Sequence, residues 1–352
     1  MITQKTLLTV AAATALTVSS ISAYAKVDAA AAAKLGTPAM TPVGADPAKN
    51  ASGSIAAWTP FAKMGALNAP PSALSDPRID NAKTTVSITS ANMATYKAQL
   101  TVGHQELLKK YPTYKMMVYP SLRPATYPDA GIAATKASAA PAALVGVDKV
   151  TNATLGFPFP ITKSGPEMIW NHKTRYRGDN VRRFNNQAIV QSDGSAAMTK
   201  LVEEVQFVYG NIASPGKADG GDMLYYLSQT LSPPKIAGQM ILAKEKMDGS
   251  REAYLYNPGL GRSRRAPSVA YDNPYEGTDG NQFNDQVDMF NGAMDRYDWT
   301  FVGKKEMYIP YNSAKTASNK IKYADLIRKG HMNQDLARYE LHRVYVVDSK
   351  IK

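Results

Sequence analysis

The sequence predicts an α+β protein in which an irregular N-terminal region and helices precede a long meander of antiparallel strands. Three observations predict this class. Apolar residues recur at helical spacing over residues 90–111, and after Gly178 the pattern changes to an alternation of polar and apolar residues. Tight-turn dipeptides such as Asp193-Gly194 and Asp248-Gly249 separate successive alternating segments. Sequential strands joined in this way form a meander that curls into an open or closed barrel.

The first 25 residues predict a secretory signal peptide. A basic start over residues 1–5 is followed by an uncharged apolar run over residues 6–19 and by the small-x-small motif Ala23-Tyr24-Ala25. The run is too short to span a bilayer as a helix. We therefore expect export, cleavage after Ala25 and a mature chain that begins near Lys26. A buried N-terminal helix is the alternative.

Composition limits the possible functions. The chain has 352 residues, a net charge of +12 and no cysteine, which excludes a disulfide scaffold, thiolate metal sites and a thiol nucleophile. Because export is expected, we predict no nucleic-acid partner despite the basic charge. The charge suits an anionic membrane surface or an acidic protein, and plain solubility through net charge is the alternative.

Residues 26–89 are expected to form an irregular N-terminal region, because they are dense in Pro, Gly, Ser and Ala after a short Ala-rich helix. The main domain is expected over residues 90–352. It begins with a predicted helix over residues 90–111, capped by Ser90. Residues 129–145 are Ala-rich and fit either a helix or a flexible insertion.

A further helix and a series of strands complete the expected elements. Ser164 and Glu167 form a capping box before an apolar run, which predicts the start of a helix. After a short strand over residues 114–119, the expected strands are residues 181–192, 198–209, 223–231, 235–246, 252–257, 261–265, 297–308 and 339–351.

No catalytic motif is present. The sequence lacks a Gly-x-Ser-x-Gly elbow and the phosphate-binding glycine motifs. The acidic residues between residues 271 and 299 lack EF-hand spacing and are interpreted as turn-forming. Glu203 and Glu204 are adjacent on an expected strand, so they point to opposite faces and cannot act as a pair. We predict no catalytic residue, no metal and no cofactor.

Six residues are candidates for ligand contact. They are Arg262, Arg264, Arg265, Trp170, Tyr225 and Trp299. The arginines follow a turn, and guanidinium forks bind phosphate or carboxylate groups in a bidentate manner. The aromatic residues would contact an apolar ligand enclosed by a curved sheet rich in Tyr and Met. A solvated strand end is the alternative for the arginines, and an ordinary core is the alternative for the aromatic residues.

Several motifs resemble one bacterial family. They are Gly156-Phe-Pro-Phe-Pro-Ile161, Glu167-Met-Ile-Trp-Asn-His172, Arg175-Tyr-Arg-Gly178, Arg264-Arg-Ala-Pro-Ser-Val-Ala-Tyr-Asp272, Phe290-Asn-Gly-Ala-Met-Asp-Arg-Tyr-Asp-Trp299 and Glu340-Leu-His-Arg-Val344. In these motifs and their order the chain is similar, from about residue 34 to residue 347, to the bacterial domain of unknown function 1329 family. That family is often labelled outer-membrane lipoprotein-sorting protein.

The resemblance implies a curved antiparallel half-barrel closed by helices, similar to the Lol lipoprotein carrier and acceptor proteins, with an apolar cavity for acyl chains. Family members usually carry further strands after the 340–344 motif. The resemblance also implies a periplasmic protein that binds or carries a lipid or lipidated protein, with an RND-type exporter and an outer-membrane protein as partners. An adaptor between exporter and outer membrane, or a periplasmic lipid-modifying enzyme, are the alternatives. No catalytic residue is carried over.

Overall fold

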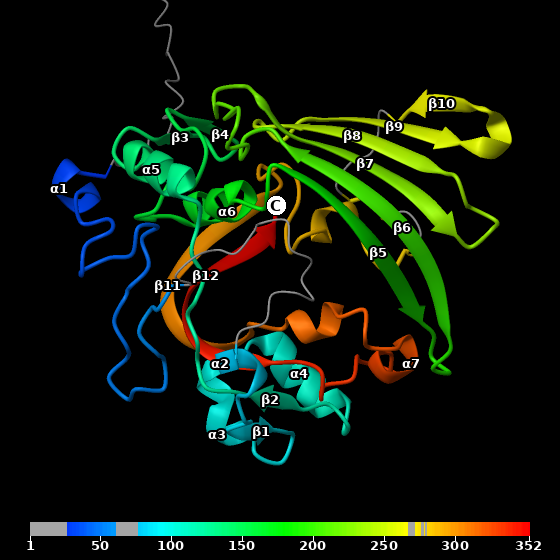
Figure 1. The fold of residues 1–352 in the computed structure, drawn as a ribbon, viewed down its shortest axis with the longest axis horizontal. Coiled ribbons are helices and arrows are strands. Elements are labelled where there is room, and N and C mark those ends of the chain that lie inside the picture. Colours follow the sequence, from blue (N-terminus) through cyan, green and yellow to red (C-terminus); the bar gives the residue numbers. More distant parts are fainter. Residues whose placement is uncertain (1–26, 61–76, 267–271, 276–277, 279) are drawn as a thin grey trace, which may run out of the picture.

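Two separate β-sheets form the framework of the molecule (Figure 1). The computed structural model describes residues 27–60, 77–266, 272–275, 278 and 280–352. The predicted signal peptide and its cleavage after Ala25 therefore lie outside the described residues. Within the described parts, no helix combines the length and the apolar character that crossing a membrane requires.

The larger sheet is an antiparallel meander of six consecutive strands. They are β5 (Asn180–Val190), β6 (Ala196–Phe207), β7 (Asp222–Ser232), β8 (Met240–Lys246), β9 (Arg251–Asn257) and β10 (Arg262–Arg265). The predicted turn at Asp193-Gly194 joins the first two, with Gly194 at a φ of +96°. The strand expected over residues 235–246 begins only at Met240. The preceding residues form a turn, in which the Ile236 N–H donates to the Pro233 carbonyl.

The second sheet contains the two strands that sequence analysis places at the end of the same meander. Its order is β1 (Val86–Ile88), β2 (Met116–Val118), β12 (Tyr339–Ile351) and β11 (Tyr297–Pro310). The prediction of one meander that includes these last strands is wrong, and the sheets do not close into a barrel. The reason is that β11 and β12 pair with each other along their length, after a long connection over residues 266–296.

Short helices surround the sheets. They are α1 (Ala29–Ala32), α2 (Pro77–Asp80), α3 (Met93–Tyr96), α4 (Val102–Lys110), α5 (Asp129–Ser138), α6 (Gly165–Thr174) and α7 (Tyr323–Leu326), with 3₁₀ turns at Lys97–Gln99, Pro258–Leu260, Asn284–Gln286 and Ala314–Ala317 and a small hairpin of β3 (Ala143–Val145) and β4 (Lys149–Thr151). The prediction of one helix over residues 90–111, capped by Ser90, is wrong. Leu100 is buried in an extended conformation, and Thr101 starts α4 by accepting a hydrogen bond from the His104 N–H at 3.1 Å.

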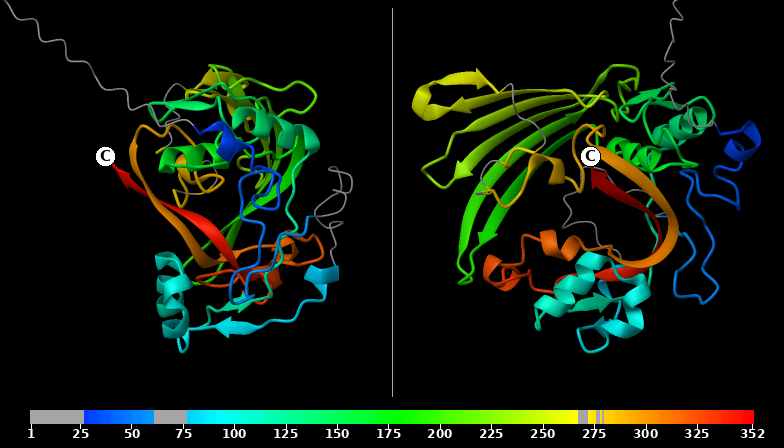
Figure 2. Two further views of the ribbon diagram at one scale, coloured as in Figure 1. Left: turned by 90° about the vertical axis from the view of Figure 1, so that its left-hand side faces the viewer. Right: turned by 180° about the vertical axis from the view of Figure 1, so that it is seen from behind.

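Helix α6 lies between the two sheets (Figures 1 and 2). Ser164 caps it by accepting a hydrogen bond from the Glu167 N–H at 3.4 Å, as the capping box predicts. One side of the helix packs on β11 and β12, where Gly165 leaves room for close approach. Trp170, on the same helix, is fully buried in a core that includes Val205 of β6. The C-terminal end of α6 is thereby held against one end of the six-stranded sheet.

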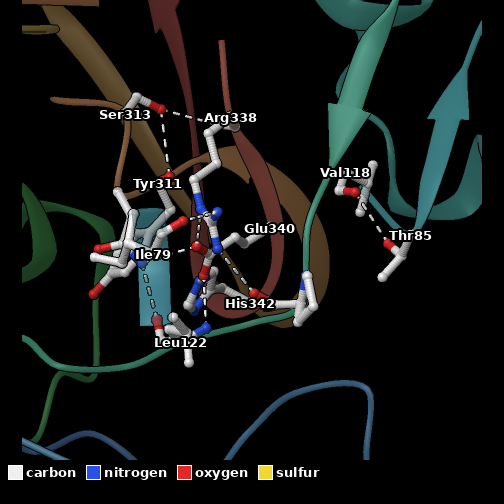
Figure 3. Close-up of polar contacts among 11 residues, drawn as sticks. Ile79, Thr85, Val118, Leu122, Tyr311, Ser313, Arg338, Glu340 and His342 are labelled. Atoms are coloured by element: carbon white, nitrogen blue, oxygen red, sulfur yellow. Dashed lines mark hydrogen bonds and ion pairs between the residues drawn. The ribbon is translucent and has the colours of Figure 1, made fainter. Parts of the chain in front are cut away.

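A buried charged network attaches the four-stranded sheet to the segments around it (Figure 3). Glu340 on β12 is fully buried, and its carboxylate accepts four hydrogen bonds. The donors are Arg338 Nε at 2.7 Å, Asn312 Nδ2 at 2.8 Å, the Leu122 backbone N–H at 2.7 Å and His342 Nε2 at 3.0 Å. Because Leu122 and Asn312 belong to other segments, the network joins three parts of the chain at β12.

The protonation state of Glu340 is linked to stability. Burial alone would raise the pKa of Glu340, but the hydrogen bonds that it accepts, from His342 first, hold that pKa below its ordinary value. A carboxyl whose pKa is lowered by folding contributes stability that is present above the pKa of the unfolded chain. That contribution is lost as the pH falls through the pKa of the folded protein.

We expect E340Q to lower the free energy of unfolding at pH 7 by about 3 kcal/mol or more, because Arg338 then keeps a buried charge without its charged partner. The deficit should shrink in acid, where the wild-type carboxyl is also protonated. Urea titrations followed by circular dichroism at both pH values measure this. The control is E204Q, in an exposed pair with Arg182 at 3.3 Å, which should change stability by less than about 1 kcal/mol. Wild-type stability of E340Q at pH 7 would contradict the expectation.

Candidate ligand-binding cavity

A cavity of about 770 Å³ lies against one face of the six-stranded sheet. Strands β5–β9 form its floor, the residues at and after the end of α6 close one end, and residues 273–275 and 282–291, called the covering segment, cover it. Its volume is within the range of small-molecule binding sites. We call the sheet face that lines this cavity the inner face and the opposite face the outer face.

Three cross-strand rows make up the inner face. Nearest to α6 the row is Phe207, Leu224, Glu245 and Arg251; the middle row is Val181, Val205, Tyr226, Ala243 and Ala253; the far row is Arg183, Glu203, Ser228, Ile241 and Leu255. Residues between these along each strand point outward, because side chains alternate between the faces of a sheet. The inner face is therefore mostly apolar, interrupted by two ion pairs and a few polar groups.

Glu203 is the centre of one polar cluster. Only 1% of its surface is exposed, and its carboxylate accepts hydrogen bonds from Arg183 Nε at 2.6 Å, Asn185 Nδ2 at 3.2 Å and the Tyr226 hydroxyl at 2.6 Å. The Tyr275 hydroxyl, in the covering segment, lies 3.1 Å from that of Tyr226. Burial first, and then the neighbouring Tyr275 and Glu203, raise the pKa of Tyr226. Tyr226 therefore stays protonated and remains a donor.

Asp288 connects the covering segment to the residues that follow α6. Its carboxylate accepts hydrogen bonds from Arg175 at 2.5 Å and Arg177 at 2.7 Å, and His172 Nε2 lies 2.7 Å from its carbonyl oxygen. Burial alone would raise the pKa of Asp288, but the guanidinium groups hold it below its ordinary value. The guanidinium carbon of Arg177 lies 4.5 Å from the ring centre of Phe207. The buried Nε of Arg177 has no hydrogen-bond partner among the described residues.

Lys173, near the end of α6, is buried beside the cavity. Its Nζ donates to the Gly292 carbonyl at 2.6 Å and lies 4.6 Å from the centre of the Trp170 ring. Burial lowers the pKa of Lys173 to about 8, although the nearby Glu245 carboxylate acts to raise it. Glu245 itself forms an ion pair with Arg251 in which only about a tenth of each side chain is exposed.

The lining has more cations than carboxylates. The cations are Lys173, Arg175, Arg177, Arg183 and Arg251, and the carboxylates are Glu203, Glu245 and Asp288. Five against three leaves an excess of two positive charges, and all the cations except Arg183 lie at the end near α6. Such an excess of positive charge around the cavity favours an anionic group. No group of three or more His, Asp or Glu side chains that could hold a metal ion occurs in the described parts of the chain.

None of the three aromatic residues singled out in the sequence lines the cavity, although two of them have neighbours that do. Trp170 lies in the core, where its indole N–H donates to the Val147 carbonyl at 2.9 Å. Tyr225 lies on the outer face, and the adjacent Tyr226 lines the cavity. Trp299 on β11 packs edge-to-face on the cavity residue Phe290, with ring centres 5.0 Å apart.

The three arginines singled out in the sequence lie together on β10, and all three are exposed. Arg264 pairs across the strands with Leu255, so it extends the far row of the inner face beyond the cavity. Arg265 pairs with Tyr254 and belongs to the outer face. Arg262 lies opposite Asn257 at the turn. Their role in ligand binding stays a prediction.

Sequence analysis does not identify the residues of the ionic clusters. Arg183 and Glu203 lie directly opposite each other on β5 and β6, a pairing that is visible only once the strand register is known. Asp288 falls among the acidic residues interpreted as turn-forming, whereas its carboxylate binds two arginines. The available signal was the closely spaced Arg175 and Arg177 after the α6 motif, but spacing alone does not reveal their partner.

Comparisons with solved structures give low structural similarity. A domain from Vibrio parahaemolyticus, provisionally named an outer membrane lipoprotein-sorting protein domain, is 13% identical, with 53% of this chain and 91% of that domain covered and a TM-score of 0.30. A DUF1329 family protein from Desulfovibrio piger is also 13% identical, with 50% of this chain and 68% of that chain covered and a TM-score of 0.29.

Sequence comparisons give stronger matches. An uncharacterized protein of Pseudomonas aeruginosa is 42% identical over 334 residues, which is 93% of this chain and 73% of the relative. The sequence model of the family described as protein of unknown function (DUF1329) matches residues 87–352, well over half of the chain. The resemblance found in the motifs is thereby confirmed, and the chain belongs to the DUF1329 family.

Proposed function

We propose that the cavity binds a long-chain amphiphile with an anionic head group, and that the protein is a periplasmic, non-catalytic lipid or lipoprotein binding or carrier protein. One observation carries the proposal: a volume of about 770 Å³ combines apolar sheet surface with an excess of two cations at one end. The head group would lie near Arg177, and the chain would extend along Ala243 and Ile241. Burying ten methylenes would contribute on the order of 8 kcal/mol.

The half-barrel expected from the resemblance to Lol proteins belongs to the same proposal. The bend of the six-stranded sheet in Figure 2 supports a half-barrel around the cavity, with α6 as one of the helices that close it. An RND-type exporter and an outer-membrane protein, the partners implied by the resemblance, would deliver or receive the ligand. Passive shielding of acyl carbons from water needs no catalytic residue.

Native mass spectrometry of the mature protein, purified from periplasm and followed by organic extraction, tests the proposal. We expect a stoichiometric lipid or acylated peptide that is released on denaturation. A ligand-free mass that persists after incubation with envelope lipids would contradict the carrier proposal. That result would favour the adaptor that docks an exporter to the outer membrane.

Filling the cavity should abolish loading. Ala243 and Ala253 face each other across β8 and β9 in the middle row, so the phenyl ring of A243F would occupy the path of the chain. We expect at least a tenfold loss of affinity for a fluorescent fatty acid in a direct titration. The control is A188F, at an exposed alanine of β5 outside the lining, which should bind normally. Equal binding by both variants would place the ligand elsewhere.

The charge excess predicts discrimination between head groups. The wild-type protein should bind a long-chain carboxylate about tenfold or more tighter than its methyl ester, since one charge-assisted hydrogen bond contributes about 1.5–3 kcal/mol. R177Q should reduce this preference and leave ester affinity nearly unchanged. R296Q, at a half-exposed arginine paired with Asp272 at 3.3 Å, is the matched control. Competition titrations measure all three, and an unaltered preference in R177Q would refute the assignment of the head group.

A further inference from the structure

The outer face of the six-stranded sheet carries a band of apolar side chains that solvent reaches. One cross-strand row runs through Phe184, Val202, Gln229, Met240 and Tyr256, and the next runs from Arg182 through Glu204, Leu227, Leu242 and Tyr254 to Arg265. We call the apolar members of these two rows the outer belt. Val202 within it is buried, and Phe184 and Tyr254 also contribute to the lining of the cavity. Phe184 is 73% exposed, Leu242 37% and Tyr256 36%. Exposed apolar side chains grouped on one face of a sheet are typical of an interaction site.

Basic residues surround the outer belt. By strand register, the basic side chains of this face are Arg182, Lys200, Lys244, Lys246 and Arg265, and the acidic ones are Glu204, Asp222 and Glu252. The excess is therefore basic. Two of the cations lie beside aromatic rings: Arg182 is 5.9 Å from the ring centre of Phe184, and Lys244 is 5.9 Å from that of Tyr225.

We infer that the outer belt docks the protein onto an anionic membrane surface. Leucine and phenylalanine side chains are stabilised when they insert at the boundary between the lipid head groups and the acyl chains. Tyrosine suits the same boundary because its ring is apolar and its hydroxyl is polar. Lysine and arginine at the margin attract anionic lipids. A second copy of the chain fits this face less well, since two such faces would bring their basic margins together.

The inference goes beyond the proposed function, because docking by the outer face does not require an occupied cavity. The two faces belong to the same strands, so neighbouring residues have separate roles: Leu242 faces outward in the outer belt, and Ala243 faces the cavity. Docking would leave the cavity on the side of the sheet that points away from the membrane. Vesicle binding and ligand loading are therefore separate measurements with separate variants.

Flotation of the purified protein with two kinds of vesicle tests the inference. One kind is pure phosphatidylcholine and the other contains equal parts phosphatidylcholine and phosphatidylglycerol. Wild-type protein should partition at least about tenfold more strongly to the anionic vesicles, and added salt should weaken this binding. The double variants L242D/Y256D and K200E/K244E should each lose about tenfold or more of it. Circular dichroism and thermal melting confirm that each variant is folded.

Two controls separate docking from general effects. V102D changes a 75% exposed apolar residue of α4, and K320E/K322E reverses exposed lysines outside the sheet; both should bind vesicles like wild type. Vesicle binding that is unchanged in both L242D/Y256D and K200E/K244E would overturn the inference, as would equal losses in the controls. An outer face that binds an acidic protein and no vesicles would overturn it too. Normal fatty-acid loading by L242D/Y256D would show that a loss of docking is not a loss of the cavity.

Discussion

Three carboxylates, two of them buried and one partly exposed, each pair with a guanidinium group and constrain how the chain is assembled. Glu340 meets Arg338 in the four-stranded sheet, and Glu203 meets Arg183 on the inner face. Asp288, in the segment that covers the cavity, is held by two arginines. An unpaired buried charge costs several kcal/mol, whereas apolar surfaces accept many partners. The ion pairs and hydrogen bonds of these carboxylates therefore constrain which segments meet, and the apolar residues supply most of the driving force once they have met.

The same pairing gives the cavity its character. If every cation were paired with its own carboxylate, the cavity would be neutral. Instead, the single carboxylate of Asp288 pairs with both Arg175 and Arg177, and Lys173 donates to a backbone carbonyl. The positive charge that remains is held by the end of α6 and by the strand ends beside it. The proposed head-group site is thus a by-product of how the covering segment is attached. The apolar rows beyond it would be available to a chain.

Local patterns in the sequence predict local structure well. Alternation after Gly178 predicts all six strands of the large sheet, and Ser164 predicts the start of α6, because both signals act between near neighbours. The break at Leu100 and the separate sheet of β11 and β12 depend on contacts between residues far apart in the sequence. A short stretch of sequence does not contain that information. The site follows the same division. The arginines of β10 are adjacent in sequence and easily seen, whereas Arg183 and Glu203 become neighbours only through strand register.

The alternation of the six strands also limits how this protein can evolve. Deleting a single codon from β6 just before Glu203 would move Glu204 to the position of Glu203. The two faces would then be exchanged for the rest of the strand. Cavity residues would then point into solvent, and exposed residues would point into the cavity. Inherited changes of length are therefore tolerable in turns such as Asp193-Gly194, while the strands can change only by substitution or by steps of two residues.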